Sequence, residues 1–162
     1  MYETKNQMRT MILSFSPEWY PYLKSGEKIF EHRKRICKEP VEAYIYLGLP
    51  YREIVAKIVM GERENISEWL DKYRYDKKAI ERIQDCLTRN NYAKPILSYQ
   101  EIYPIDVKKM EKELNAFRVP ISYMFIDDRP DILNYIRDHE TNISKEITHD
   151  FCNLSSDKIC TC

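Results

Sequence analysis

The chain has 162 residues, of which 43% are hydrophobic and 32% charged, a composition typical of one globular domain with its own core. Its 26 basic and 26 acidic residues give a formal net charge of +0, which excludes an overall basic protein and limits nucleic-acid contacts to a local patch. No apolar run is long enough to span a membrane, and the polar N-terminus has no signal-peptide core. The five cysteines are an odd number, which favours free thiols, so we expect a cytoplasmic protein.

The N-terminal segments predict an extension, a strand and a helix. Residues 1–10 are polar and aperiodic, and we expect a flexible extension there. Residues 11–15 are apolar and predict a short strand. Ser16 followed by Pro17 is typical of a helix N-cap and the first helical residue, and Gly26 is expected to end this helix.

A second strand is predicted over residues 28–35, directly after the turn at Gly26. Because side chains alternate along a strand, the two faces differ in charge. One face bears Ile29, Glu31, Arg33 and Arg35, and the other bears Phe30, His32 and Lys34. Glu31 and Arg33 thus place a carboxylate and a guanidinium on one face, close to Lys28 at the start of the strand. If this face lines a cleft, these residues form a binding site. If it faces water, they form an ordinary solvated surface.

The remaining segments are predicted as strands and helices without an internal repeat. Four more strands are expected at residues 41–47, 52–60, 95–105 and 122–126. Helices are expected in an insertion at residues 66–90, at 107–114 after the cap Asp106, and at 131–137. Strands without regular βαβ alternation favour an α+β fold, a small mixed β-barrel, partly closed, with helices at its ends.

The C-terminal segment, residues 138–162, is predicted to be a tail, and it contains residue types that can bind a metal ion. It contains His149, Cys152, Cys160 and Cys162, and these residue types can bind zinc. Their spacing matches no standard zinc finger. We therefore expect a disordered or loosely packed tail and no metal site.

The chain resembles the ASCH domain family, most specifically in the motifs of residues 14–50. The family opens with Ser-x-x-Pro, matched by residues 14–17, and continues with Gly-x-Lys-x-x-Glu-x-Arg, matched by Gly26, Lys28, Glu31 and Arg33. Its next strand ends in tyrosine plus small residues, as residues 44–50 do. The resemblance covers roughly residues 11–127. It implies a domain at residues 11–137 with a PUA-like β-barrel and a cleft between the first helix and the barrel.

The resemblance also implies a role in RNA or nucleotide binding, because PUA-like proteins largely bind RNA. In the cleft, Lys28 would contact a phosphate, and Glu31 would orient Arg33 toward a phosphate or a base edge. Three further residues are candidate ligand contacts: Ser16 at a helix N-terminus, Arg35 in a basic run and Tyr46 as a stacking surface. Their alternative roles are a helix cap, a solvated charge and a packed core tyrosine.

Two other functions stay open. Some small ASCH proteins are amidohydrolases that remove acyl groups from N4-acylated cytidine nucleosides with a lysine, a threonine and a glutamate. Lys28 matches the lysine, whereas Glu31 occupies the threonine position, so Lys28 and Glu31 would be the catalytic pair. Alternatively, the basic helical insertion at residues 66–90 is a protein-interaction or regulatory surface. No cofactor is expected for any of these functions.

Overall fold

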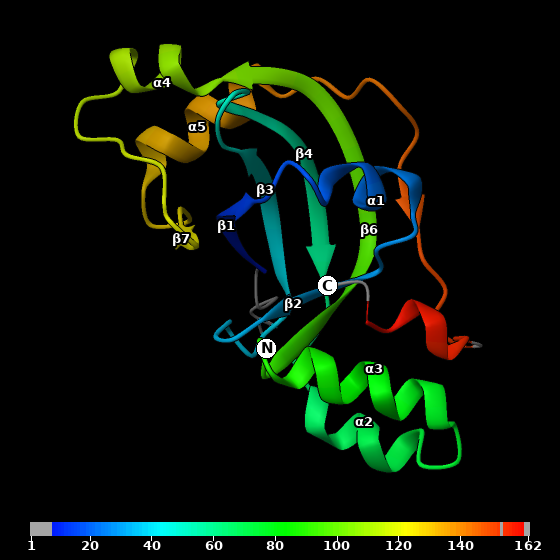
Figure 1. Cartoon of the computed structure of the whole chain (residues 1–162). Coiled ribbons are helices and arrows are strands. Elements are labelled where there is room, and N and C mark those ends of the chain that lie inside the picture. The colour runs from blue at the N-terminus through cyan, green and yellow to red at the C-terminus, as the bar shows by residue number, and fades with distance from the viewer. Residues whose placement is uncertain (1–7, 153, 161–162) are drawn as a thin grey trace, which may run out of the picture.

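The computed structural model describes residues 8–152 and 154–160, and shows one strongly curved mixed sheet with helices around it (Figure 1). The strands are β1 (Arg9–Phe15), β2 (Phe30–Arg33), β3 (Val41–Leu47), β4 (Glu53–Met60), β5 (Glu64–Asn65), β6 (Tyr92–Asp106), β7 (Tyr123–Phe125) and β8 (Ile147–Thr148). The helices are α1 (Tyr20–Ser25), α2 (Ile66–Lys72), α3 (Lys77–Leu87), α4 (Val107–Glu113), α5 (Pro130–His139) and the 3-10 turn η1 (Ser156–Lys158). None of the helices in these ranges is long and apolar enough to cross a bilayer.

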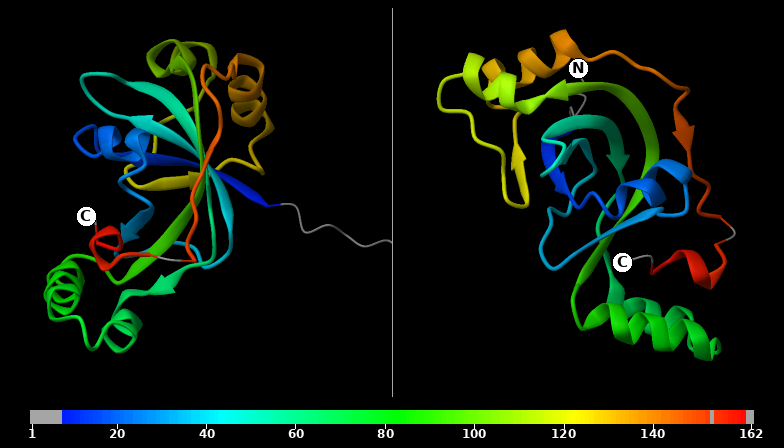
Figure 2. Two further views of the ribbon diagram at one scale, coloured as in Figure 1. Left: turned by 90° about the vertical axis from the view of Figure 1, so that its right-hand side faces the viewer. Right: turned by 45° about the horizontal axis from the view of Figure 1, so that its top comes forward.

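The sheet follows the order β2-β6-β4-β3-β1-β7, and the short strands β5 and β8 add to β6. β1 pairs with β3 in parallel, whereas the other pairs are antiparallel. The pairing of β4 with β6 shifts register twice, and such bulges bend a sheet. Figure 2 shows β6 curving around the molecule. The predicted α+β fold with a mixed, partly closed barrel is confirmed.

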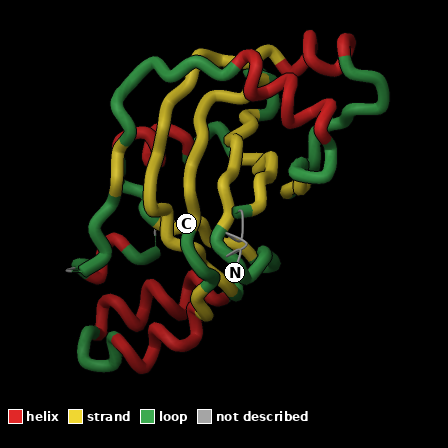
Figure 3. The backbone as a smooth tube through the Cα atoms, turned by 180° about the vertical axis from the view of Figure 1, so that it is seen from behind, coloured by secondary structure: helices red, strands yellow, loops and turns green. Residues whose placement is uncertain are grey.

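Both faces of the sheet are buried, which explains the continuous apolar runs in its strands. On β1, Met11 and Leu13 join the cluster inside the barrel, and Ile12 joins the cluster under α4 and α5. The pairs α2–α3 and α4–α5 lie at opposite ends of the sheet (Figures 1 and 3). The expected position of the helices at the barrel ends is therefore confirmed.

Helix α1 starts later than the sequence predicts. Its N-cap is Trp19, and the predicted N-cap role of Ser16 is wrong. The backbone carbonyl of Ser16 accepts a hydrogen bond from the Trp19 amide at 3.1 Å, so a separate turn precedes the helix. Pro21, instead of Pro17, occupies the first helical turn. Gly26 ends the helix as predicted, with φ of 84° in the left-handed region.

The described parts of the two terminal segments are more ordered than the sequence suggests. Most of the expected extension at residues 1–10 lies outside the described residues, and Arg9 and Thr10 belong to β1. In the C-terminal segment, β8 pairs with β6, and Ile159 is buried against the α2–α3 pair. The rings of Phe151 and Phe30 pack edge-on, with their centroids 5.4 Å apart. These apolar side chains cover a cluster that the barrel and the insertion would otherwise expose.

A buried lysine holds the turn between β2 and β3. Lys94 donates hydrogen bonds from Nζ to the backbone carbonyls of Cys37, at 2.9 Å, and Glu39. We expect Lys94→Met to lower the free energy of unfolding by about 1–3 kcal/mol, because both carbonyls lose their donor. Chemical denaturation measures this. Lys38→Met, at an exposed position of the same turn, is the matched control, and equal stabilities of the two variants would contradict this role of Lys94.

Candidate functional site

The candidate site is a cavity of about 310 Å³ between the turn before α1 and strand β2. It is lined by Ser14, Phe15, Ser16, Trp19, Lys28, Glu31, His32, Arg33 and Asn90. Gly26 reverses the chain after α1, which brings the segment from Lys28 back beside Trp19. The cleft that the ASCH resemblance implies, between the first helix and the barrel, has its counterpart in this cavity.

Two contacts hold α1 against the barrel and so fix one wall of the cavity. The hydroxyls of Tyr20 on α1 and Tyr99 on β6 are hydrogen-bonded at 2.7 Å. Lys24 donates to Glu101 at 2.9 Å. Burial raises the pKa of both tyrosines, so their hydroxyls stay protonated at neutral pH.

The charged residues of the cavity form a chain of contacts. Lys28 Nζ lies 3.9 Å from Glu31 Oε2, and the two side chains are only 5% and 6% exposed. Glu31 Oε1 accepts a hydrogen bond from Arg33 Nε at 2.7 Å. Within the described part of the chain, Glu31 Oε2 is buried and has no hydrogen-bond partner. Because a buried carboxylate oxygen normally accepts hydrogen bonds, this atom is suited to a donor on a ligand.

Arg33 connects strands at the open edge of the barrel. Besides its bond to Glu31, it donates from Nη2 to the Ser14 carbonyl on β1 at 2.7 Å. Nη1 donates to the hydroxyl of Ser122, directly before β7, at 3.2 Å. β2 and β7 are the two ends of the strand order, so Arg33 joins edges that the backbone ladder leaves apart. Arg33 therefore holds β2 against β1 and against the segment before β7.

His32 is neutral and lies beside Lys28. Burial, together with the Lys28 ammonium, lowers the pKa of the imidazole to about 3. Nε2 lies 2.7 Å from the Ile159 carbonyl, which can only accept, so Nε2 bears the proton. Nδ1 is then an acceptor, and Lys28 Nζ lies 3.4 Å from it. Because His32 is neutral, the charged residues of the cavity are the cations Lys28 and Arg33 and the anion Glu31. The cavity therefore has a formal charge of one positive unit.

The structure brings four of the six predicted site residues together. Ser16, Lys28, Glu31 and Arg33 line this cavity. Tyr46 is buried and lines a neighbouring cavity of about 320 Å³, which shares Ser14, Phe15 and Ser16 with the first. Arg35 is exposed and lies beyond the end of β2.

The predicted site residues leave out five of the residues that line the cavity: Ser14, Phe15, Trp19, His32 and Asn90. Alternation placed His32 on the face opposite Glu31, and its ring does pack edge-on against Trp69, yet it also reaches the cavity. Trp19 directly precedes the helix and is half-buried. Asn90 follows α3, and only the fold brings it near β2. Its approach has no signal in the sequence.

The fold is similar to that of solved ASCH structures. The crystal structure of ASCH from Zymomonas mobilis matches with a TM-score of 0.64 at 18% identity, over 84% of this chain and 99% of that one. The chain has the fold of an ASCH domain. Crystal structures of two mutants of ZmASCH match at a TM-score of 0.62 and 16% identity, over 82% of this chain and 97% or 99% of theirs. No family model and no curated protein matches, so the ASCH likeness is one of fold.

Proposed function

We propose that this ASCH-fold protein binds a single nucleobase, from a modified nucleotide or from RNA, in the cavity beside Lys28. One observation supports this above the others. Glu31 Oε2 is buried at the cavity and is without a hydrogen-bond partner among the described residues, so a ligand with an N–H donor would satisfy it.

The chemistry of the lining suits an amino-bearing pyrimidine. A glutamate carboxylate accepts a hydrogen bond from the exocyclic N4 amino group of cytosine. Lys28 and Arg33 are donors that suit the carbonyl oxygen of a base or a phosphate. Trp19 provides an aromatic surface at the same cavity, and bases stack on such surfaces. Together these groups match the polar edge and the flat face of one base.

Size and net charge favour a small ligand or one unstacked base over a long nucleic-acid track. A volume of about 310 Å³ lies at the lower end of the range for small-molecule pockets. Tight non-specific binding of nucleic acid requires many phosphate contacts, and the chain has a formal net charge of +0. Affinity would therefore come from the cavity.

Isothermal titration against a ligand panel tests this proposal. The panel contains cytidine, cytidine monophosphate, N4-acetylcytidine, uridine and a short single-stranded RNA rich in cytosine. We expect saturable binding of cytosine-bearing ligands and weaker binding of uridine, which lacks the amino donor. Binding of the mononucleotides indicates a nucleotide ligand, and binding of the oligomer alone indicates RNA. No binding of any panel member at millimolar concentration would overturn the proposal.

A second candidate, the amidohydrolase, is favoured by the proton-exchanging groups around Lys28. Its Nζ lies 3.4 Å from His32 Nδ1 and 3.9 Å from Glu31 Oε2. In this reading water adds to the acyl carbon, the bond from that carbon to N4 breaks, and cytidine and a carboxylic acid leave. Glu31 would act as the general base, and Lys28 would stabilise the developing oxyanion.

Mass spectrometry of N4-acylated cytidines incubated with the protein separates the two candidates. Turnover by the wild type that disappears in Lys28→Ala would support the hydrolase. Binding without turnover at micromolar protein would leave the cavity as a binding site only.

A further inference from the structure

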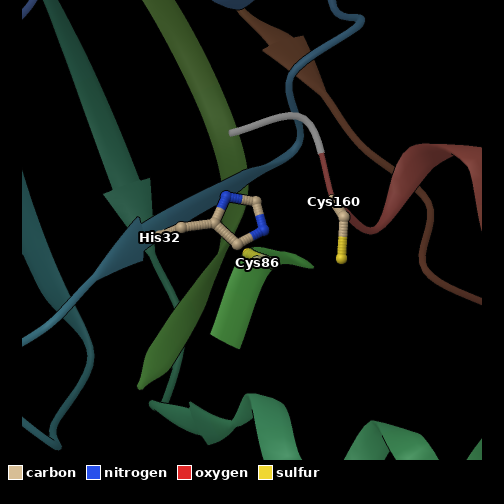
Figure 4. A group of neighbouring side chains, drawn as sticks. All are labelled: His32, Cys86 and Cys160. Carbon is tan, nitrogen blue, oxygen red and sulfur yellow. The ribbon is translucent and has the colours of Figure 1, made fainter. Parts of the chain in front are cut away.

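Three metal-binding side chains from distant parts of the sequence meet beside the cavity. They are His32 on β2, Cys86 on α3 and Cys160 after η1. One ligand atom from each lies within 4.8 Å of the other two. Figure 4 shows the His32 imidazole and the two sulfur atoms gathered between β2, α3 and the C-terminal segment. Within residues 8–152 and 154–160, no other three such residues come as close together.

These groups lie in an apolar environment. Cys86 and His32 are buried, and Cys160 is half-buried. The surrounding cluster contains Ile66, Ile83 and Ile159, and the Trp69 ring packs edge-on against the imidazole. Apolar side chains would be enough to pack this space. Packing alone therefore does not explain why two thiols and an imidazole lie together there. A largely apolar site with nitrogen and sulfur ligands favours a thiophilic metal ion over a hard, oxygen-seeking one.

We propose that His32, Cys86 and Cys160 bind a thiophilic metal ion, best matched by Zn²⁺. Cysteine and histidine are the ligands that zinc prefers, and three protein ligands leave one coordination position for a fourth group. Binding deprotonates both thiols, and the two protons pass to solvent. The two thiolates neutralise the charge of the ion, so the site adds no net charge beside Lys28.

Small movements complete the geometry. Zinc–ligand bonds of about 2.0–2.3 Å place the ligand atoms of a tetrahedral site about 3.5–3.8 Å apart. The three atoms must therefore approach one another from separations of up to 4.8 Å. His32 Nε2 must also exchange its 2.7 Å contact with the Ile159 carbonyl for the metal. Cys160 follows directly, so a shift of this one segment supplies both changes.

A bound ion would join three parts of the fold. Cys86 is near the end of the helical insertion, Cys160 is in the C-terminal segment, and His32 is a strand residue that lines the candidate cavity. The ion would fix the insertion and the C-terminal segment to the wall of the cavity. This structural effect does not depend on the identity of the cavity ligand.

Cobalt binding to the reduced, metal-free full chain tests the proposal. We expect one Co²⁺ per chain, a thiolate-to-cobalt charge-transfer absorption band, and loss of the band when Zn²⁺ is added. Cys86→Ser and Cys160→Ser should each weaken Co²⁺ binding at least tenfold. Cys37→Ser and Cys152→Ser, which change thiols outside the group, should leave it unchanged. Zn²⁺ should also raise the melting temperature of the wild type and leave that of Cys160→Ser unchanged.

Three outcomes of the cobalt experiment would overturn the proposal. Cys86 is buried, so Cys86→Ser could unfold the chain; Cys160 is half-buried, and Cys160→Ser keeps the test valid. A band that survives Cys160→Ser would overturn the proposal. So would a band that depends on Cys152 or Cys162 but not on Cys86, because the C-terminal cysteines would then hold the ion by themselves. Absence of any charge-transfer band in the wild type would overturn it as well.

Discussion

Arg33→Met is expected to lower the free energy of unfolding by about 3–5 kcal/mol. The guanidinium donates to Glu31, to the Ser14 carbonyl and to Ser122, and so joins β2 to β1 and to the segment before β7. Methionine fills a similar volume but donates no hydrogen bond. The variant therefore leaves the largely buried Glu31 carboxylate without its closest cation. Urea denaturation followed by circular dichroism measures the loss.

Arg35→Met is the matched control for this prediction. Arg35 is two residues further along the chain and exposed, so the same substitution should change stability by no more than about 0.5 kcal/mol. An equal loss of stability in both variants would contradict the prediction, because the hydrogen bonds of Arg33 would then contribute nothing specific to the fold.

Glu31→Gln is expected to weaken binding of the best cytosine-bearing ligand about 10- to 100-fold. A hydrogen bond to a charged acceptor contributes about 1.5–3 kcal/mol, and each 1.4 kcal/mol is a factor of ten in affinity. Glutamine keeps the shape and can still accept from Arg33, but it removes the charge and places an N–H₂ group where the ligand donor would lie. Titration calorimetry of the folded variant measures the change.

Glu27→Gln controls for the loss of one negative charge. Glu27 is exposed and precedes Lys28, so its substitution changes the net charge equally without touching the cavity lining. Its affinity should match that of the wild type. Equal weakening in both variants would show that long-range charge, and not the buried carboxylate, controls binding.

Local signals in the sequence predicted much of the barrel. The strand over residues 41–47 is observed with the same bounds, because β-branched and aromatic residues fill a sheet that is buried on both faces. Gly26 ends α1, and Asp106 caps α4 by accepting a hydrogen bond from the Lys109 amide at 3.2 Å. Each of these features depends on residues within one turn or one strand, which is why a sequence argument reaches them.

Features that depend on long-range contacts could not be predicted. The pairing of Glu31 with Arg33 follows from alternation along β2, but the bonds from Arg33 to Ser14 and Ser122 require the two ends of the sheet to lie side by side. The order of the C-terminal segment depends on an apolar cluster formed by elements far apart in the chain. The proximity of Cys86 and Cys160 could not be predicted either, because these residues are far apart in the sequence and close only in the folded chain.

The most direct test of the cavity as a nucleobase site is the indole N–H signal of Trp19 in solution NMR. Trp19 lines the cavity, whereas Trp69 on α2 donates its indole N–H to Glu64 at 3.2 Å and acts as an internal reference. Trp19→Phe assigns the two signals. We predict that cytidine monophosphate shifts the Trp19 signal saturably and more than that of Trp69, and that Glu31→Gln raises the concentration required. A Trp19 signal that stays in place while ligand binds would contradict the account.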